Sequence, residues 1–128
     1  MRLLLDTHTL LWWHAKAGAL SDTVRDALKD PKHDVFLSVV SAWEMQIKVS
    51  LGKLPLPGTV PELIGEELRE NGFLPLSVTF DHVYALAGLP AHHKDPFDRL
   101  LVAQARHEGL TLVTDDRQIQ QYDLLTLW

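Results

Sequence analysis

The chain contains no cysteine and has fewer basic than acidic side chains. The absence of cysteine excludes a disulfide framework and a thiolate metal site, and it agrees with a reducing, cytoplasmic environment. The 12 Lys and Arg residues against 17 Asp and Glu residues give a formal net charge of −5. Proteins that hold nucleic acid by neutralising phosphates usually carry a basic excess. A nucleic-acid function would therefore need another source of positive charge.

Long hydrophobic runs, internal repeats, low-complexity segments and domain linkers are also missing. The apolar stretch at the N-terminus is interrupted by Asp6 and is too short for a signal peptide or a membrane span. With 128 residues, 23% of them charged and 46% hydrophobic, the composition is that of an ordinary globular domain. We expect one soluble domain over residues 1–128, with no membrane partner.

Short apolar runs alternate with helix-like segments along the chain. Strands are predicted at Arg2–Leu5, Val35–Ser38, Phe73–Leu76, Leu110–Thr114 and Leu124–Leu127. Helices are predicted at Thr9–Lys16, from Ser21 to about Asp30, from a Ser41 cap to Gly52, from Pro61 to about Asn71, at Thr79–Gly88 and at Pro96–Glu108. Because parallel strands need crossover connections, this order predicts an α/β fold with a central parallel sheet of about five strands and helices on both faces.

Four acidic residues from separate segments are expected at one edge of this sheet. The carboxyl ends of parallel strands and the N-termini of the following helices share one edge, and sites form there. Asp6 ends the first strand, and Glu44 lies in the first predicted turn of the helix after the second strand. Asp98 lies in the first turn of a later helix, and Asp116 follows the strand that ends at Thr114.

Each acid also has a purely structural interpretation. Glu44 completes the sequence S-A-W-E, which is a capping box with Ser41. Asp98 lies in D-P-F-D, where a cap, a proline and an acid are typical of a helix start. Asp116 could be a turn residue in T-D-D-R. Asp6 is the hardest to explain in this way, because a carboxylate at the edge of a core is costly without a partner.

Together, the four carboxylates would repel one another and raise each other's pKa unless a cation neutralised them. Oxygen ligands select hard ions, so Mg²⁺ or Mn²⁺ is expected rather than zinc. Thr7 and Thr114 each stand beside an acid and are candidates to orient ligands or water, although threonine near a strand end also reflects β-propensity. The adjacent His92 and His93 suggest metal binding, but neighbouring loop residues point apart, and we expect solvated histidines there.

Basic residues near these acids are candidate contacts for a negatively charged substrate. Lys48 lies four residues after Glu44, hence on the same helical face, where it could instead form an ordinary ion pair. Arg99 and Arg117 flank Asp98 and Asp116, and either could simply be surface charge. The bound metal would itself supply positive potential where a phosphate must dock.

Three segments of the chain are LLLDTHTLLW, SVVSAWEMQIKVSLGKLPLP and HHKDPFDRLLVAQARHEGLTLVTDD. In their order and spacing they closely resemble PIN-domain ribonucleases, in particular the VapC toxins of bacterial and archaeal toxin–antitoxin pairs. The resemblance implies cleavage of RNA phosphodiester bonds with Mg²⁺ or Mn²⁺, and it assigns the catalytic and metal-binding roles to Asp6, Glu44, Asp98 and Asp116. Asp95 could share the role of Asp98, and Asp115 is an alternative to Asp116.

The resemblance also implies partners. A homodimer is expected, together with a cognate VapB-like antitoxin whose C-terminal segment lies over the early helices and reaches the acidic site. Trp12, Trp13 and Trp43 are expected in the core or at the dimer interface, because aromatic side chains bury a large area. The RNA substrate itself is recognised by shape and exposed loops, so its identity does not follow from these residues.

Three alternatives compete with a nuclease. A receiver-like signalling domain also gathers acids around Mg²⁺, but the segment after Val113 lacks the lysine that such a domain needs to contact a phosphate. A phosphatase of the D-x-D-x-T type would need a second acid where D-T-H-T has His8. A catalytically inactive PIN scaffold is disfavoured because all four acids are present.

Overall fold

Five parallel strands form the central sheet in the computed structural model of the chain, which describes residues 1–128. They are β1 (Arg2–Leu5), β2 (Asp34–Ser38), β3 (Leu74–Leu76), β4 (Thr111–Val113) and β5 (Thr126–Leu127). Their order in the sheet is β3-β2-β1-β4-β5, and every pairing is parallel. The predicted parallel α/β architecture is therefore confirmed, with the first strand of the chain at the centre of the sheet.

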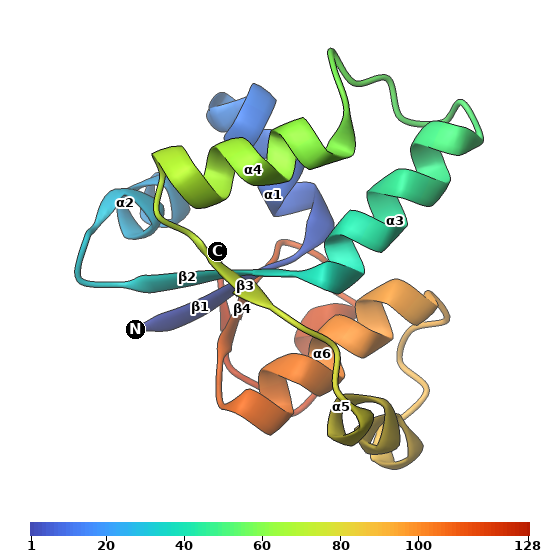
Figure 1. The fold of residues 1–128 in the computed structure, drawn as a ribbon. Coiled ribbons are helices and arrows are strands. Elements are labelled where there is room, and N and C mark those ends of the chain that lie inside the picture. The colour runs from blue at the N-terminus through green and yellow to red at the C-terminus, as the bar shows by residue number, and fades with distance from the viewer.

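Helices cover both faces of the sheet. Figure 1 shows α1 (Thr7–Ala15), α2 (Asp22–Lys29) and α4 (Val60–Glu70) above the strands, and α5 (Phe80–Ala85) and α6 (Pro96–Glu108) below them. The helix α3 (Val39–Ser50) continues directly from the end of β2 and projects past the edge of the sheet. Short 3₁₀ turns complete the fold at Ala17–Ala19, Leu86–Gly88 and Ile119–Gln121. None of the helices combines the length and apolar character needed to cross a membrane.

The leucines of β1 divide the core between the two faces. Leu3 and Leu5 are buried in a cluster with side chains of α1, α2 and α4, whereas Leu4 is buried in a second cluster with side chains of α6. Successive side chains of a strand point to opposite faces, so a continuous apolar run is what a strand covered on both sides requires. Trp12 and Trp13 pack against the first cluster, as predicted.

The cap of α3 lies three residues before the predicted Ser41 cap, so that prediction was wrong. Ser38 is the cap, and its hydroxyl accepts the N–H of Val40 at 3.0 Å. The strand β2 passes into the helix without a loop, because Ser38 is still extended and paired in the sheet while it caps the next residue. Glu44 therefore lies in the second turn of α3 and forms no capping box with Ser41.

The helix α1 also begins earlier than predicted, at Thr7 instead of Thr9. Asp6 is its cap, and its carboxylate accepts the N–H of Thr9 at 2.8 Å. The start of α6 agrees with the prediction, because Asp95 caps it and Pro96 occupies the first turn. Its end also agrees, since Gly109 adopts the left-handed conformation, with φ of 67°.

Candidate active site

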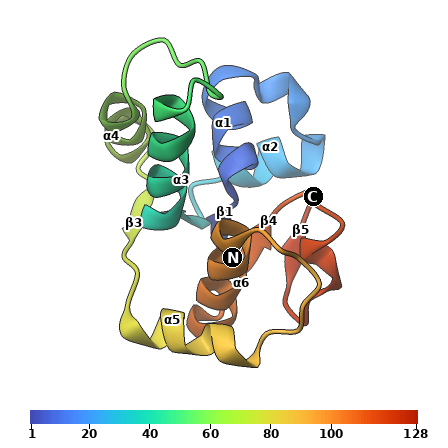
Figure 2. The same cartoon turned by 90° about the vertical axis from the view of Figure 1, so that its right-hand side faces the viewer.

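The predicted site acids come from four separate elements at the edge where the parallel strands end, and Figure 2 views the domain from this edge. Asp6 follows β1, Glu44 lies in α3, Asp98 lies in the first turn of α6, and Asp116 follows β4. The N–H of Asp6 bonds to the carbonyl of Val113 at 3.2 Å, so the ends of β1 and β4 lie side by side. The topology of the sheet is what brings these distant residues together.

Asp6 is buried at the centre of this edge. Burial raises its pKa, because a charged carboxylate loses its hydration, while hydrogen bonds from Thr114 and Thr9 act in the opposite direction. The Thr114 hydroxyl also accepts the N–H of Asp116 at 3.1 Å. Thr114 thus links the first predicted acid to the loop that carries the fourth.

Glu44 is buried, and both of its carboxylate oxygens are hydrogen-bonded. The Thr7 hydroxyl donates to Oε1 at 2.6 Å, and the Lys48 ammonium donates to Oε2 at 2.6 Å. The hydrogen bond to Glu44 raises the pKa of Lys48, and the negative charges of Glu44, Asp95 and Asp98 raise it further. The ion pair considered from the sequence is therefore present, and it stands beside the acids.

Asp98 interacts with the other acids through its charge. Its pKa is raised to about 7, first by burial, then by repulsion from Asp95 and Glu44, with a smaller contribution from Asp6, while His93 lowers it. A carboxyl group with this pKa holds a proton near neutral pH when no cation is bound. The repulsion that Asp95, Glu44 and Asp6 exert on Asp98 indicates excess negative charge at this edge.

His93 enters this cluster, and the expectation of a solvated loop histidine was wrong for it. Its side chain is 12% exposed, and Nε2 lies 3.1 Å from Oδ2 of Asp98 and 3.3 Å from Oδ2 of Asp116. The three side chains each offer one atom within 4.8 Å of the other two, which is a spacing that can hold a metal ion. The loop that carries His93 has no periodic pattern, so its residues carry no signal that this side chain would reach the acids. The one indication is that His93 lies two residues before Asp95, the cap of α6. The neighbouring His92 is exposed, as expected.

The acids that the sequence left as alternatives, Asp115 to Asp116 and Asp95 to Asp98, differ in environment. Asp116 is half-buried, with Oδ2 toward His93 and Oδ1 accepting the N–H of Gln118 at 2.8 Å. Asp115 is exposed. Asp95 uses Oδ1 to cap α6 by accepting two backbone N–H groups, and its charge raises the pKa of Asp98.

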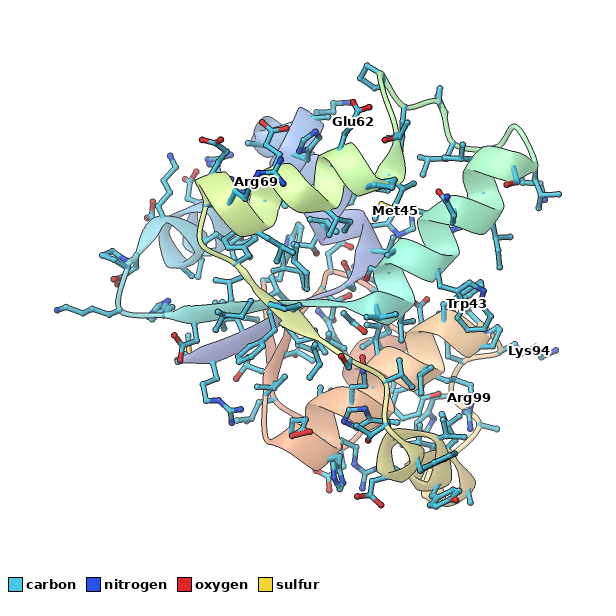
Figure 3. All side chains as sticks on the ribbon, in the orientation of Figure 1. Trp43, Met45, Glu62, Arg69, Lys94 and Arg99 are labelled. Atoms are coloured by element: carbon cyan, nitrogen blue, oxygen red, sulfur yellow. The ribbon has the colours of Figure 1, made fainter.

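The arginines near the site also differ. Arg117 is exposed. The Arg99 guanidinium donates to the carbonyl of Pro90 at 2.8 Å and to the Tyr122 hydroxyl at 3.1 Å, and it thereby joins α6 to the loop before it. In Figure 3 Arg99 lies beside α6, next to the loop that precedes this helix, and Trp43 lies between α3 and the start of α6. Trp43 is 52% exposed, with its ring edge-on to Phe97 at 4.8 Å.

The donor set fits a hard divalent cation. It consists of carboxylate oxygens, with no thiolate, and magnesium and manganese prefer such ligands. Lys48 is the only ammonium bonded to one of the four acids. A bound cation would relieve the repulsion that raises the pKa of Asp98.

A family model for the PIN domain matches residues 3–125. The chain belongs to the PIN domain family. PIN nucleases generally depend on divalent metal ions, in agreement with the acidic cluster described above. The family predicted from the sequence is confirmed, and the receiver-like and phosphatase alternatives are set aside.

Curated relatives of this PIN domain include two ribonucleases of Mycobacterium tuberculosis. Ribonuclease VapC22 is 30% identical over 125 residues, which cover 94% of this chain and 91% of the relative. Ribonuclease VapC16 is 38% identical over 66 residues, which cover 52% of this chain and only 46% of the relative.

Solved structures of bacterial proteins have the same fold. VapBC2 from Rickettsia felis, bound to a DNA fragment from its promoter, matches with a TM-score of 0.73 and 17% identity, over 99% of this chain and 98% of the matched chain. FitAcB from Neisseria gonorrhoeae matches with a TM-score of 0.60 and 19% identity, over 98% and 96% of the two chains. At these identities the likeness establishes the fold.

Proposed function

We propose that this PIN domain is an endoribonuclease that uses Mg²⁺ or Mn²⁺ and acts as the toxin of a type II toxin–antitoxin pair. The observation that carries the proposal is the convergence of four acids from distant segments at one sheet edge, with the pKa of Asp98 raised to about 7 by burial and by its acidic neighbours. The similarity to ribonuclease VapC22 over 94% of the chain supports ribonuclease chemistry.

In this proposal Asp6, Asp98 and Asp116 bind the metal, together with Glu44. When bound, the ion would activate water and neutralise charge on the phosphate during cleavage. The protein holds the ligands in place beforehand: Thr114 and the start of α1 orient Asp6, while Thr7 and Lys48 orient Glu44. Such fixed ligands lose little freedom when the ion and the substrate bind.

Lys48 and Arg117 are the proposed RNA contacts. Lys48 is bonded to Glu44 and 37% exposed, so its ammonium can reach a phosphate that docks on the acids. Arg117 is exposed beside Asp116. The Arg99 guanidinium is occupied by a carbonyl and a hydroxyl, which supports a role in holding the preceding loop in place of an RNA contact. With a net charge of −5, the metal would supply the main attraction for phosphate.

The proposed partners are a VapB-like antitoxin and a second copy of the chain. The similarity to VapBC2, which was solved as a complex, supports the antitoxin. Figure 2 shows α3, the edge strand β3 and α5 on one side of the domain. A homodimer is supported by the large hydrophobic side chains that are exposed on these elements and on the segment between β3 and α5: Val39, Trp43, Leu74, Val78, Phe80, Val83 and Tyr84. An apolar surface of this kind is typical of a protein interface.

Cleavage of RNA by the purified chain tests the nuclease. We expect cleavage with Mg²⁺ or Mn²⁺, none with EDTA, and none with Asp6→Asn or Asp98→Asn. Asp123→Asn is the matched control, because Asp123 is an exposed acid in another loop. If both site variants cleave at the wild-type rate with added Mn²⁺, the site assignment is wrong. If the folded wild type binds metal without cleaving any RNA, the chain is an inactive scaffold.

Expression of the chain in a bacterial host tests the toxin role: we expect growth arrest, and reversal of the arrest when a VapB-like protein encoded immediately upstream of the gene is expressed with it. Unimpaired growth during expression of the active chain would contradict a toxin. Sedimentation of the purified chain tests the homodimer. We expect Phe80→Lys to shift the dimer toward monomer, while the exposed substitution Gln120→Lys leaves it unchanged.

A further inference from the structure

His93 is turned toward the acids by the loop that leads into α6. Lys94, the next residue, is exposed and points away from the domain in Figure 3. The loop is held from both sides, because Arg99 donates to the carbonyl of Pro90, and the capping side chain of Asp95 accepts N–H groups of α6. The imidazole of His93 is therefore fixed in one orientation before any ligand binds.

The hydrogen bonds of the two ring nitrogens identify the tautomer of His93. Nδ1 lies 3.0 Å from the backbone N–H of Asp95, which can only donate, so Nδ1 must accept and carries no proton. The proton of the neutral ring then resides on Nε2. This Nε2–H faces Oδ2 of Asp98 at 3.1 Å and Oδ2 of Asp116 at 3.3 Å, so one donor lies between the two carboxyl groups.

The same geometry disfavours His93 as a metal ligand. Ligation through Nε2 would need a lone pair there, which would move the proton to Nδ1. The proton on Nδ1 would then face the N–H of Asp95, leaving two donors opposed at 3.0 Å. The spacing of His93, Asp98 and Asp116 would accommodate an ion, but the hydrogen-bond directions make the histidine a donor to the two acids.

We propose that His93 is a positioning residue that holds Asp98 and Asp116 as a pair of metal ligands without binding the metal itself. Two carboxylates that face each other tend to turn apart, and a donor shared between their Oδ2 atoms opposes this. The inference rests on the proposed metal-dependent nuclease and adds a residue to its site.

Affinity for Mn²⁺, measured by calorimetry without RNA, tests the positioning role in three variants. His93→Gln keeps an amide donor near the place of Nε2. The shorter amide of His93→Asn reaches the place of Nδ1 but puts no donor near that of Nε2, and His93→Ala keeps neither. We expect His93→Gln to bind Mn²⁺ within about threefold of the wild type, and the other two to bind about tenfold more weakly. His92→Gln, in the same loop, is the control, since His92 contacts none of the acids.

The inference is overturned if all three variants bind Mn²⁺ like the wild type, or if His93→Gln loses as much affinity as His93→Ala. Thermal unfolding of each variant shows that a loss is not a loss of fold. Separate values of kcat and KM for RNA cleavage give a second readout. We expect His93→Ala to lower kcat at saturating RNA, and His93→Gln to retain a kcat near that of the wild type.

Nitrogen NMR of the imidazole decides between donor and ligand in the wild type. We expect a protonated Nε2 and an unprotonated Nδ1 in metal-free protein, and the same pattern after Mg²⁺ is added. Loss of the Nε2 proton on addition of Mg²⁺ would make His93 a ligand and refute the inference. If the wild type fails to cleave RNA while this pattern and the Mn²⁺ affinities are as expected, the nuclease proposal fails and the role of His93 stands.

Discussion

The Thr7 hydroxyl donates a 2.6 Å hydrogen bond to Oε1 of Glu44, which joins the first turn of α1 to the second turn of α3. Both side chains are buried. Because Lys48 holds the other carboxylate oxygen, Glu44 has one orientation, set by residues from two helices.

Replacing Thr7 with valine removes the donor and leaves Glu44 with an unpaired buried oxygen. We expect a loss of about 1–3 kcal/mol in the free energy of unfolding and slower RNA cleavage. Urea denaturation and a cleavage assay measure the two effects. Thr23→Val, at an exposed position of α2, is the control. An unchanged stability would mean that the hydrogen bond contributes nothing in solution.

Asp98 should make metal-free protein less stable as pH rises. Its pKa is about 7 in the folded chain against an ordinary value of 3.8, so the native state holds a proton that the unfolded state has lost between these values. Stability therefore falls as pH rises through this window, and the loss is complete above pH 7. We expect Asp98→Asn to stabilise the chain by about 1–3 kcal/mol at pH 8 in EDTA, with little effect at pH 4. Asp123→Asn should show no such difference.

Divalent metal should stabilise the folded chain, because it binds acids that are assembled only in that state. At a free concentration of one hundred times Kd, we expect Mn²⁺ to add about 2.7 kcal/mol to the free energy of unfolding. Calorimetric melting with Mn²⁺ and with EDTA measures this as a shift in Tm. Asp6→Asn should lose most of the shift. An equal shift in that variant would show that the ion binds elsewhere.

Lys48→Met should leave the buried Glu44 carboxylate without its counter-charge. We expect a loss of about 1–2 kcal/mol in metal-free stability, since Lys48 is partly exposed and water weakens the pair. The pKa of Lys48 is raised, so this contribution persists at neutral pH and is lost only when pH rises through that raised value. Unfolding of Lys48→Met and of the exposed control Lys53→Met at pH 7 checks this. Equal stability of the two variants would contradict the expectation.

Asp115 and Asp116 should differ strongly in their effect on cleavage. Asp116 faces His93 and the other acids, whereas Asp115 is exposed. We expect Asp116→Asn to lower kcat/KM by at least about 100-fold, the cost of losing a group that stabilises the transition state, and Asp115→Asn to change it only a few-fold. Cleavage rates under identical Mn²⁺ concentrations measure both. The reverse result would exchange the roles of the two residues.

Local patterns in the sequence were sufficient for most of the fold. The leucines of β1 sit between polar ends, and Asp95, Pro96 and Gly109 mark the limits of α6, so these elements follow from residues close together in the chain. Alternation of such strands and helices allows few arrangements other than a parallel sheet, and the order of motifs indicated the PIN family. The four acids could be named because topology alone brings them to one edge.

Tertiary structure decided what depends on contacts between distant segments. The cap of α3 is Ser38 and not Ser41, because pairing with β3 determines where β2 ends. His93 reaches the acids only because the loop before α6 packs beside the loop after β4, 23 residues away. Ser38 and Ser41 have the same intrinsic preference for capping a helix, and a loop histidine has the same local preferences whether or not it contacts acids from another segment. The neighbours of a residue across the fold determine which hydrogen bond it forms, and these neighbours are known only once the chain has folded.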